Sequence, residues 1–213
     1  MDTKTRILKA AEKLFAQNGF DKTTVDKIAY KAKVNKAMIY YHFKNKDQIK
    51  EALFDNFIYE IINMFDDSLD LVLDFGSSER FREFFDQYLL FWEERKDILR
   101  VIFMESLKKS DKNFSLFKFM DIIIKNEEEK IVNLMKQKGI STNYDRTLVL
   151  IADFFTGLIP LFSYTLYRNQ WCEHYKVSED ELRDKFFKAY AMTHLAYHKT
   201  LEEQLKRKID FDY

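Results

Sequence analysis

The sequence predicts an all-α protein, and both its composition and its apolar periodicity favour this class. Four glycines and one proline occur in 213 residues, whereas a chain built of strands needs many turn residues of these types. Apolar residues recur at steps of three and four, which places them on one face of a helix. The chain is long enough to bury a sizeable core, as one domain or as two.

Three short helices are predicted at the amino-terminal end of the chain. The first covers about residues 2–17, with one apolar stripe, and ends at Asn18-Gly19, where glycine can take the left-handed conformation. The second is capped by Thr23 or Thr24, whose hydroxyl groups can satisfy a free backbone amide. A third helix of about eight residues, 36–43, begins after a tight turn and is capped by Asn35.

Longer helices are predicted over the rest of the chain. Their expected ranges are 46–67, 79–94, 96–109, 114–138, 144–170 and 179–206. Pro160 removes one backbone hydrogen bond and is expected to kink its helix near Thr156. The helix over 46–67 has no flexible linker before it, so it joins the amino-terminal helices directly to the remainder.

The charges are distributed unevenly along the chain, although the formal net charge is zero. Residues 1–50 hold 12 basic and 5 acidic side chains, and residues 51–213 hold 23 and 30, so the two parts carry +7 and −7. A basic part of this kind favours an anionic polymer as its partner, although chance clustering on a solvated surface is the alternative.

Several features favour a cytoplasmic protein with no membrane partner. Cys172 is the single cysteine, which excludes an intrachain disulfide and fits a reducing compartment. The amino-terminal residues lead directly into an amphipathic pattern, so no signal peptide is expected. The longest uncharged stretch is 154–167, and its 14 residues are too few to span a bilayer.

Residues 24–46 have the pattern of a helix-turn-helix, in which the second helix enters the major groove of DNA. Lys36 can donate to guanine, Ala37 permits a close backbone approach, and Met38 can contact a thymine methyl group. Other side chains can bind phosphate oxygens, and these are Thr24, Lys27, Tyr40, Tyr41, His42 and Lys46. Tyr40 can instead belong partly to the core, and His42 can cap the helix end.

Residues 3–55 resemble the DNA-binding domain of the tetracycline-repressor (TetR) family of bacterial transcription regulators. The matching residues are Ile7-Leu8, Ala11, Leu14-Phe15, Gly19-Phe20, Thr24, Ile28-Ala29, Val34, Tyr40-Tyr41-His42-Phe43 and Asn45-Lys46. The resemblance implies a homodimeric repressor of nine or ten helices that leaves its operator when a small molecule binds. It also implies DNA contacts by Lys36, Ala37, Tyr40, Tyr41, His42 and Lys46.

This resemblance divides the chain into a DNA-binding domain, 1–46, and a helical ligand-binding and dimerisation domain, 47–213. The sequence departs from the family at Lys33, where the family places glycine, and a left-handed conformation there would cost roughly 1 kcal/mol. It also has Asn35-Lys36-Ala37-Met38-Ile39-Tyr40 where the family favours Ser-Lys-Gly-Thr-Leu-Tyr. The second departure bears on which operator sequence is recognised.

The second domain is rich in aromatic residues and methionine, which line adaptable apolar cavities but also fill ordinary cores. We expect an apolar or aromatic effector against Phe57, Ile61, Met64, Tyr88, Trp92, Phe103, Met104, Phe117, Met120, Phe154 and Phe155. Residues 154–167 are apolar on nearly all sides, and the last helix carries apolar residues at three- and four-residue steps. These two long helices are expected to form a homodimeric four-helix bundle.

Other functions find weaker support in the sequence. His194 and His198 have metal-ligand spacing, but no glutamate lies between them as in a zinc protease, so we expect no metal and no cofactor. Cys172 lies near His174 without an evident third partner, so we expect no enzyme. A ligand-independent DNA-binding regulator, an activator and a scaffold that merely dimerises remain as alternatives.

Overall fold

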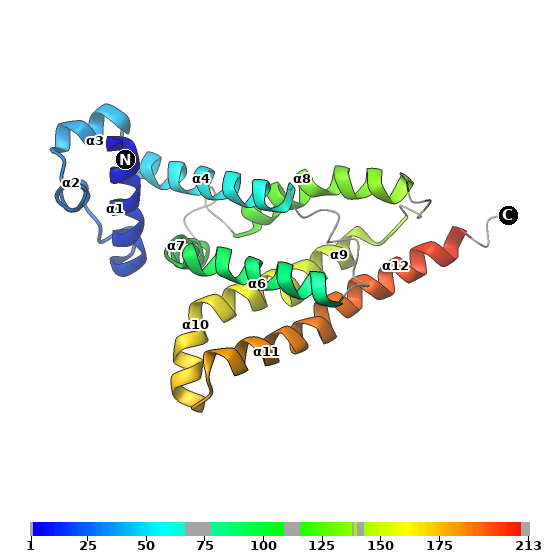
Figure 1. Ribbon diagram of the computed structural model, residues 1–213. Coiled ribbons are helices and arrows are strands. Elements are labelled where there is room, and N and C mark those ends of the chain that lie inside the picture. The colour runs from blue at the N-terminus through cyan, green and yellow to red at the C-terminus, as the bar shows by residue number, and fades with distance from the viewer. Residues whose placement is uncertain (1, 67–77, 109–115, 138, 140–142, 210–213) are drawn as a thin grey trace. The chain divides into compact units, whose positions relative to one another are not determined.

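The computed structural model describes residues 2–66, 78–108, 116–137, 139 and 143–209, and all regular structure in these ranges is helical. Figure 1 shows the helices in chain order. They are α1 Thr3–Asn18, α2 Val25–Ala32, α3 Lys36–His42, α4 Lys46–Asp66, α6 Ser78–Glu94, α7 Lys96–Ser106, α8 Leu116–Gln137, α9 Arg146–Ala152, η1 Asp153–Leu158, α10 Ile159–Tyr175, α11 Glu179–Tyr190, η2 Ala191–Leu195 and α12 Ala196–Ile209. The prediction of an all-α fold is confirmed.

The chain forms two compact units. Unit 1 consists of residues 1–64 and 95–123, and unit 2 consists of residues 65–94 and 124–213. The functional division predicted between residues 46 and 47 stays a prediction, since it concerns what each part binds.

Three predicted helix ends differ from the observed ends by three or more residues. The last helix, predicted over 179–206, continues to Ile209 at the end of α12. The helix that contains Pro160 continues to Tyr175 instead of 170, because Lys176 ends it in the left-handed conformation, with φ 57° and ψ 40°. The helix predicted to reach residue 109 ends at Ser106, as α7.

In unit 1, the first two helices are joined by a loop that depends on two threonines. Gly19 has a φ of 79°, and its N–H donates to the Phe15 carbonyl. Thr23 is fully buried, and its hydroxyl lies 2.9 Å from the Gly19 carbonyl. Thr24 caps α2 by accepting from the Lys27 amide at 3.3 Å. The structure thus assigns the cap to Thr24 and loop closure to Thr23, which the sequence had left open.

The turn between α2 and α3 contains a strained residue. Lys33 adopts the left-handed conformation, with φ 54° and ψ 47°, which costs a residue with a Cβ roughly 1–2 kcal/mol. The Arg6 guanidinium donates from Nη2 to the Ala32 carbonyl at 2.6 Å and to the Lys33 carbonyl at 2.8 Å. Arg6 therefore satisfies backbone acceptors at the end of α2 and ties the turn to α1.

The core of unit 1 includes buried side chains from α1, α4 and α7, together with one buried ion pair. Ile7, Phe15, Ile49 and Leu99 are fully buried. Lys50 on α4 and Glu105 on α7 form an ion pair at 3.5 Å, with side chains 7% and 3% exposed. Lys108 also binds Glu105, at 2.6 Å, and reaches Asp21 in the α1–α2 loop at 2.7 Å. The end of α7 is thereby bonded to both α4 and the loop that precedes α2.

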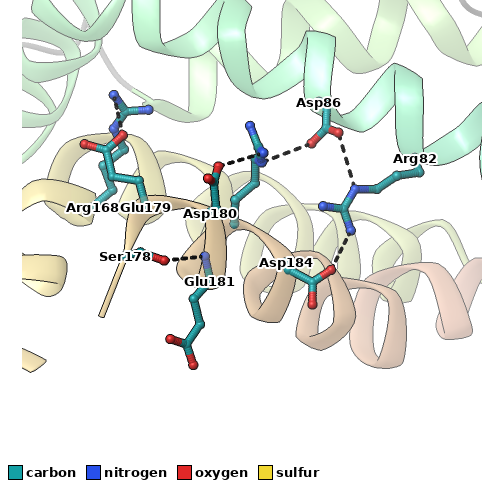
Figure 2. Close-up of polar contacts among 9 residues, drawn as sticks. Arg82, Asp86, Arg168, Ser178, Glu179, Asp180, Glu181 and Asp184 are labelled. Atoms are coloured by element: carbon teal, nitrogen blue, oxygen red, sulfur yellow. Dashed lines mark hydrogen bonds and ion pairs between the residues drawn. The ribbon is translucent and has the colours of Figure 1, made fainter. Parts of the chain in front are cut away.

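Unit 2 has an aromatic core. Trp92 on α6 is fully buried and meets Phe162 on α10 edge to face, with ring centroids 4.9 Å apart. Phe85 packs in the same manner against Phe187 on α11, at 5.1 Å. Figure 2 shows a chain of ion pairs in which Arg82 on α6 binds both Asp86 and Asp184. Because Asp184 belongs to α11, these pairs join the two helices alongside the aromatic contacts.

Two π-helical segments, η1 and η2, interrupt the two long helices of unit 2. The π segment η1 contains Thr156 and ends two residues before Pro160, and the kink expected near Thr156 stays a prediction. The two π segments lie against each other. Wider helical turns at these places alter which side chains face the neighbouring helix.

Candidate nucleic-acid interface

The helix-turn-helix consists of α2, the turn at Lys33 and α3. Asn35 begins α3 by accepting a hydrogen bond from the Met38 amide at 2.8 Å. Ile39 and Phe43 are 1% and 2% exposed, so this face of α3 belongs to the core. The opposite face is left for solvent or for a partner.

The two tyrosines of α3 lie on its solvent side. Tyr41 is 81% exposed and Tyr40 is 50% exposed. Half of the Tyr40 side chain is therefore accessible to a partner, and its binding of phosphate stays a prediction. Ala37 is also exposed, and Met38 is half-buried. This face combines two phenol groups with a small residue, Ala37, in the first turn of the helix.

Lys36, at the front of α3, is engaged by a neighbouring acid. Its Nζ lies 2.9 Å from Asp26 Oδ2 on α2, and the two side chains are 49% and 70% exposed. This hydrogen bond raises the pKa of the Lys36 ammonium above its ordinary value, so the group is charged at neutral pH. Exposed ion pairs contribute little to stability, so a stronger anionic acceptor can displace Asp26.

Two lysines predicted to bind phosphate, Lys46 and Lys27, already donate hydrogen bonds to backbone carbonyl groups. The Lys46 ammonium donates to the Phe20 and Thr23 carbonyls at 2.7 and 2.9 Å and lies 4.1 Å from the Phe20 ring centroid. Lys46 thus fastens α4 to the α1–α2 loop with two of its three N–H groups. Lys27 donates to the Lys22 carbonyl at 3.1 Å.

His42 is the last residue of α3, and its Nε2 does not cap the helix end, which was the alternative role allowed by the sequence. Its ring meets Tyr41 edge to face, with centroids 5.0 Å apart. Nε2 is buried and has no hydrogen-bond partner among the described residues. Phosphate binding by His42 stays a prediction, and it requires Nδ1 or a movement of the ring.

Two residues on or beside this surface were not predicted from the sequence. Tyr30 on α2 is 88% exposed and lies three positions after Lys27, on the same helix face. That spacing was a usable signal. Arg6 holds the turn from 26 and 27 residues away, and no local pattern indicates such a contact.

The residues predicted to line an effector site are divided between the two units. Those of unit 1 are Phe57, Ile61, Met64, Phe103, Met104, Phe117 and Met120, and those of unit 2 are Tyr88, Trp92, Phe154 and Phe155. Phe57, Ile61, Tyr88, Trp92 and Met120 are buried, whereas Phe117 and Phe155 are 66% and 64% exposed. Met104 is 39% exposed and lies beside Gly19. Their shared role stays a prediction.

The helix-turn-helix is also recognised by comparison with known proteins. Residues 7–53 match the model of the family described as bacterial regulatory proteins, tetR family. The amino-terminal segment is thus similar to the DNA-binding domain of TetR-family regulators. This agrees with the resemblance found in the sequence. The matched family and the curated relatives are transcription regulators and not enzymes, in line with the expectation from the sequence.

The curated relatives are similar only in part. The transcriptional regulator YhgD of Bacillus subtilis is 37% identical over 75 residues, which are 35% of this chain and 39% of that protein. The regulator TtgR of Pseudomonas putida is 40% identical over 55 residues, 26% of each chain. The matched segments thus span between a quarter and two fifths of these TetR-family relatives.

Solved structures extend the similarity of fold over most of the chain. A TetR-family transcription regulator from Marinobacter aquaeolei is 19% identical, with a TM-score of 0.58, over 88% of this chain and 93% of that one. The fatty acid degradation regulator FadR from Bacillus halodurans is 17% identical, with a TM-score of 0.55, over 87% and 96%. At this identity, the similarity concerns the fold.

Proposed function

We propose that the protein is a sequence-specific DNA-binding transcription regulator, and that it acts as a repressor released from its operator by a small apolar or aromatic ligand. The observation that carries this proposal is the exposed face of α3, with Lys36, Tyr40 and Tyr41 around the exposed Ala37. The helix has seven residues, about 10 Å of length, and can read a few base pairs in the major groove.

In this proposal, base contacts come from Lys36 and Met38 and phosphate contacts from the surrounding side chains. The donors predicted from sequence are Thr24, Lys27, Tyr40, Tyr41, His42 and Lys46. We add Tyr30 because of its exposure on α2. The excess of basic residues in 1–50 supports this interface, because phosphate contacts dominate affinity for DNA.

We further propose that the protein acts as a homodimer through the two long helices of unit 2. The run Arg146–Tyr175 is long and apolar enough to cross a membrane by length and composition, yet only 28% of its most apolar window is buried. Its exposed side chains include Ile151, Phe155, Tyr167 and Trp171. A second copy can cover such a face and hold two recognition helices about 34–36 Å apart, one turn of DNA.

DNA binding is tested by selecting bound duplexes from a random pool and measuring affinity for the selected site. We expect Lys36→Ala and Tyr41→Ala to weaken binding roughly 5- to 150-fold, the equivalent of about 1–3 kcal/mol. Tyr59→Ala is the matched control, because Tyr59 is 67% exposed on α4 of the same unit. Unchanged affinity in both interface variants would contradict the assignment of α3.

Salt dependence gives an independent measurement on the same duplex. The logarithm of affinity is expected to fall steeply and linearly with the logarithm of salt concentration, because each phosphate contact displaces counterions. A flat response would contradict the phosphate contacts. Ligand-dependent loss of operator binding separates the proposed repressor from the alternative, a ligand-independent regulator or activator.

The dimer is tested by sedimentation of Phe155→Lys, with Leu90→Lys as the control on α6. The two native side chains are 64% and 62% exposed, so the variants differ mainly in which face receives the charge. Dissociation by Phe155→Lys alone supports the interface. Equal effects of both variants, or wild-type protein recovered only with detergent, would overturn it.

A further inference from the structure

Three side chains of types that bind metal ions meet inside unit 2. Asp153 is the first residue of η1, His194 lies in η2, and His198 lies one turn further along in α12. One ligand atom from each of the three lies within 4.8 Å of those of the other two. None of the three is an exposed residue.

The separations are close to those that a metal ion imposes. Bonds of about 2.0–2.2 Å at a tetrahedral angle place ligand atoms roughly 3.4 Å apart. His198 Nε2 and Asp153 Oδ1 are 2.9 Å apart, and the third ligand atom lies within 4.8 Å of both. Side-chain movements of about an ångström therefore suffice to admit an ion.

A threonine sets the protonation pattern of His194. The Thr156 hydroxyl donates its single hydrogen to the Ala152 carbonyl at 2.7 Å. Its oxygen can therefore only accept a hydrogen bond from His194 Nδ1, which lies 3.1 Å away. His194 then carries its proton on Nδ1 and keeps a lone pair on Nε2. This relation, in which a neighbour holds the proton of one ring nitrogen and leaves the other free, is typical of metal-binding histidine.

Gly157 makes room for the same ring. A Cβ atom at this position would lie 2.6 Å from Cε1 and 2.9 Å from Nε2 of His194. No ordinary contact is that short, so the place that His194 occupies requires glycine on the facing turn of η1. The two π segments and this glycine together bring the imidazole beside Asp153.

We propose that Asp153, His194 and His198 bind one divalent transition-metal ion of the class of Zn²⁺. Two imidazoles and one carboxylate suit Zn²⁺, Co²⁺ or Ni²⁺ rather than Mg²⁺ or Ca²⁺, which prefer oxygen ligands throughout. Binding requires the hydrogen between His198 Nε2 and Asp153 to move to Nδ1 or to leave as a proton. This proposal revises the expectation of no metal, and it is independent of the proposed function.

The test is a titration of chelator-treated full-length protein with Zn²⁺, together with the visible spectrum of its Co²⁺ form. We expect one ion per chain, a raised melting temperature, and the intense absorption of Co²⁺ in a low-coordinate nitrogen and oxygen site. Asp153→Asn and His194→Gln are expected to weaken Zn²⁺ binding at least about 100-fold, and Thr156→Val about 10- to 100-fold. Far-UV circular dichroism checks that each variant is folded.

His174→Gln is the matched control, because His174 is an exposed histidine of α10 in the same unit. Its affinity for Zn²⁺ is expected to equal that of the wild type. The proposal is overturned if wild-type protein takes up no Zn²⁺, if folded Asp153→Asn and His194→Gln bind it as tightly as the wild type, or if His174→Gln loses it.

Discussion

Replacing Lys33 by glycine is expected to stabilise unit 1. Lys33 has a φ of 54°, and a left-handed conformation costs a residue with a Cβ roughly 1–2 kcal/mol. Glycine removes this cost but makes the unfolded chain more flexible, which offsets about 0.5–1 kcal/mol. The carbonyl that accepts from Arg6 belongs to the backbone and is retained. The net gain is therefore about 0.5–1 kcal/mol.

The measurement is hydrogen exchange of peptides that cover α2 and α3, combined with urea denaturation followed by circular dichroism. Lys31→Gly is the control for this prediction, because Lys31 lies within α2, where glycine costs about 1 kcal/mol. The two variants, only two positions apart, should thus shift the free energy of unfolding in opposite directions. A second test in unit 2 is Lys176→Gly, since Lys176 has a φ of 57°.

The reasoning is refuted if Lys33→Gly destabilises unit 1 as Lys31→Gly does. That result would mean that the Lys33 side chain contributes more than the backbone strain costs.

Two further predictions concern buried ionisable groups. Lys50→Met should lower the free energy of unfolding by about 1–3 kcal/mol. This loss is smaller than the loss expected on breaking an isolated buried ion pair, because Lys108 still binds Glu105. The double variant Lys50→Met with Glu105→Met should be more stable than the single one in urea denaturation, and an additive loss would contradict this account. Burial lowers the pKa of His194 from its ordinary 6.5 to about 4, so the unfolded chain binds more protons between these values. Stability in the presence of chelator should therefore be complete above about pH 6.5 and fall, on the order of 2–3 kcal/mol, as the pH drops toward 4. His194→Gln should flatten this part of the curve, since Asp153 and His198, which lie beside the ring, are present in both proteins. A parallel fall in the variant would assign the loss to other groups.

Much of the helix-turn-helix could be predicted from sequence because its determinants are local. The apolar stripe of α1, the Asn35 cap and the short α3 depend on residues within four positions of one another. The left-handed conformation of Lys33 was only raised as a condition, because the similar family places glycine there, and the structure shows that Lys33 adopts it. Periodicity likewise placed α4 within one residue of its observed end.

The contacts between distant residues were decided by the tertiary structure. Lys46 was expected to bind phosphate, yet its ammonium is held by carbonyl groups 23 and 26 residues away. His194 and His198 stood out by their spacing, but Asp153 precedes His198 by 45 residues and joins them only because η1 packs against η2. The sequence by itself determined the helices, because caps and periodicity act over one or two turns. The packing of the helices determined which polar groups of different helices come into contact, because such contacts depend on the path of the chain between the helices.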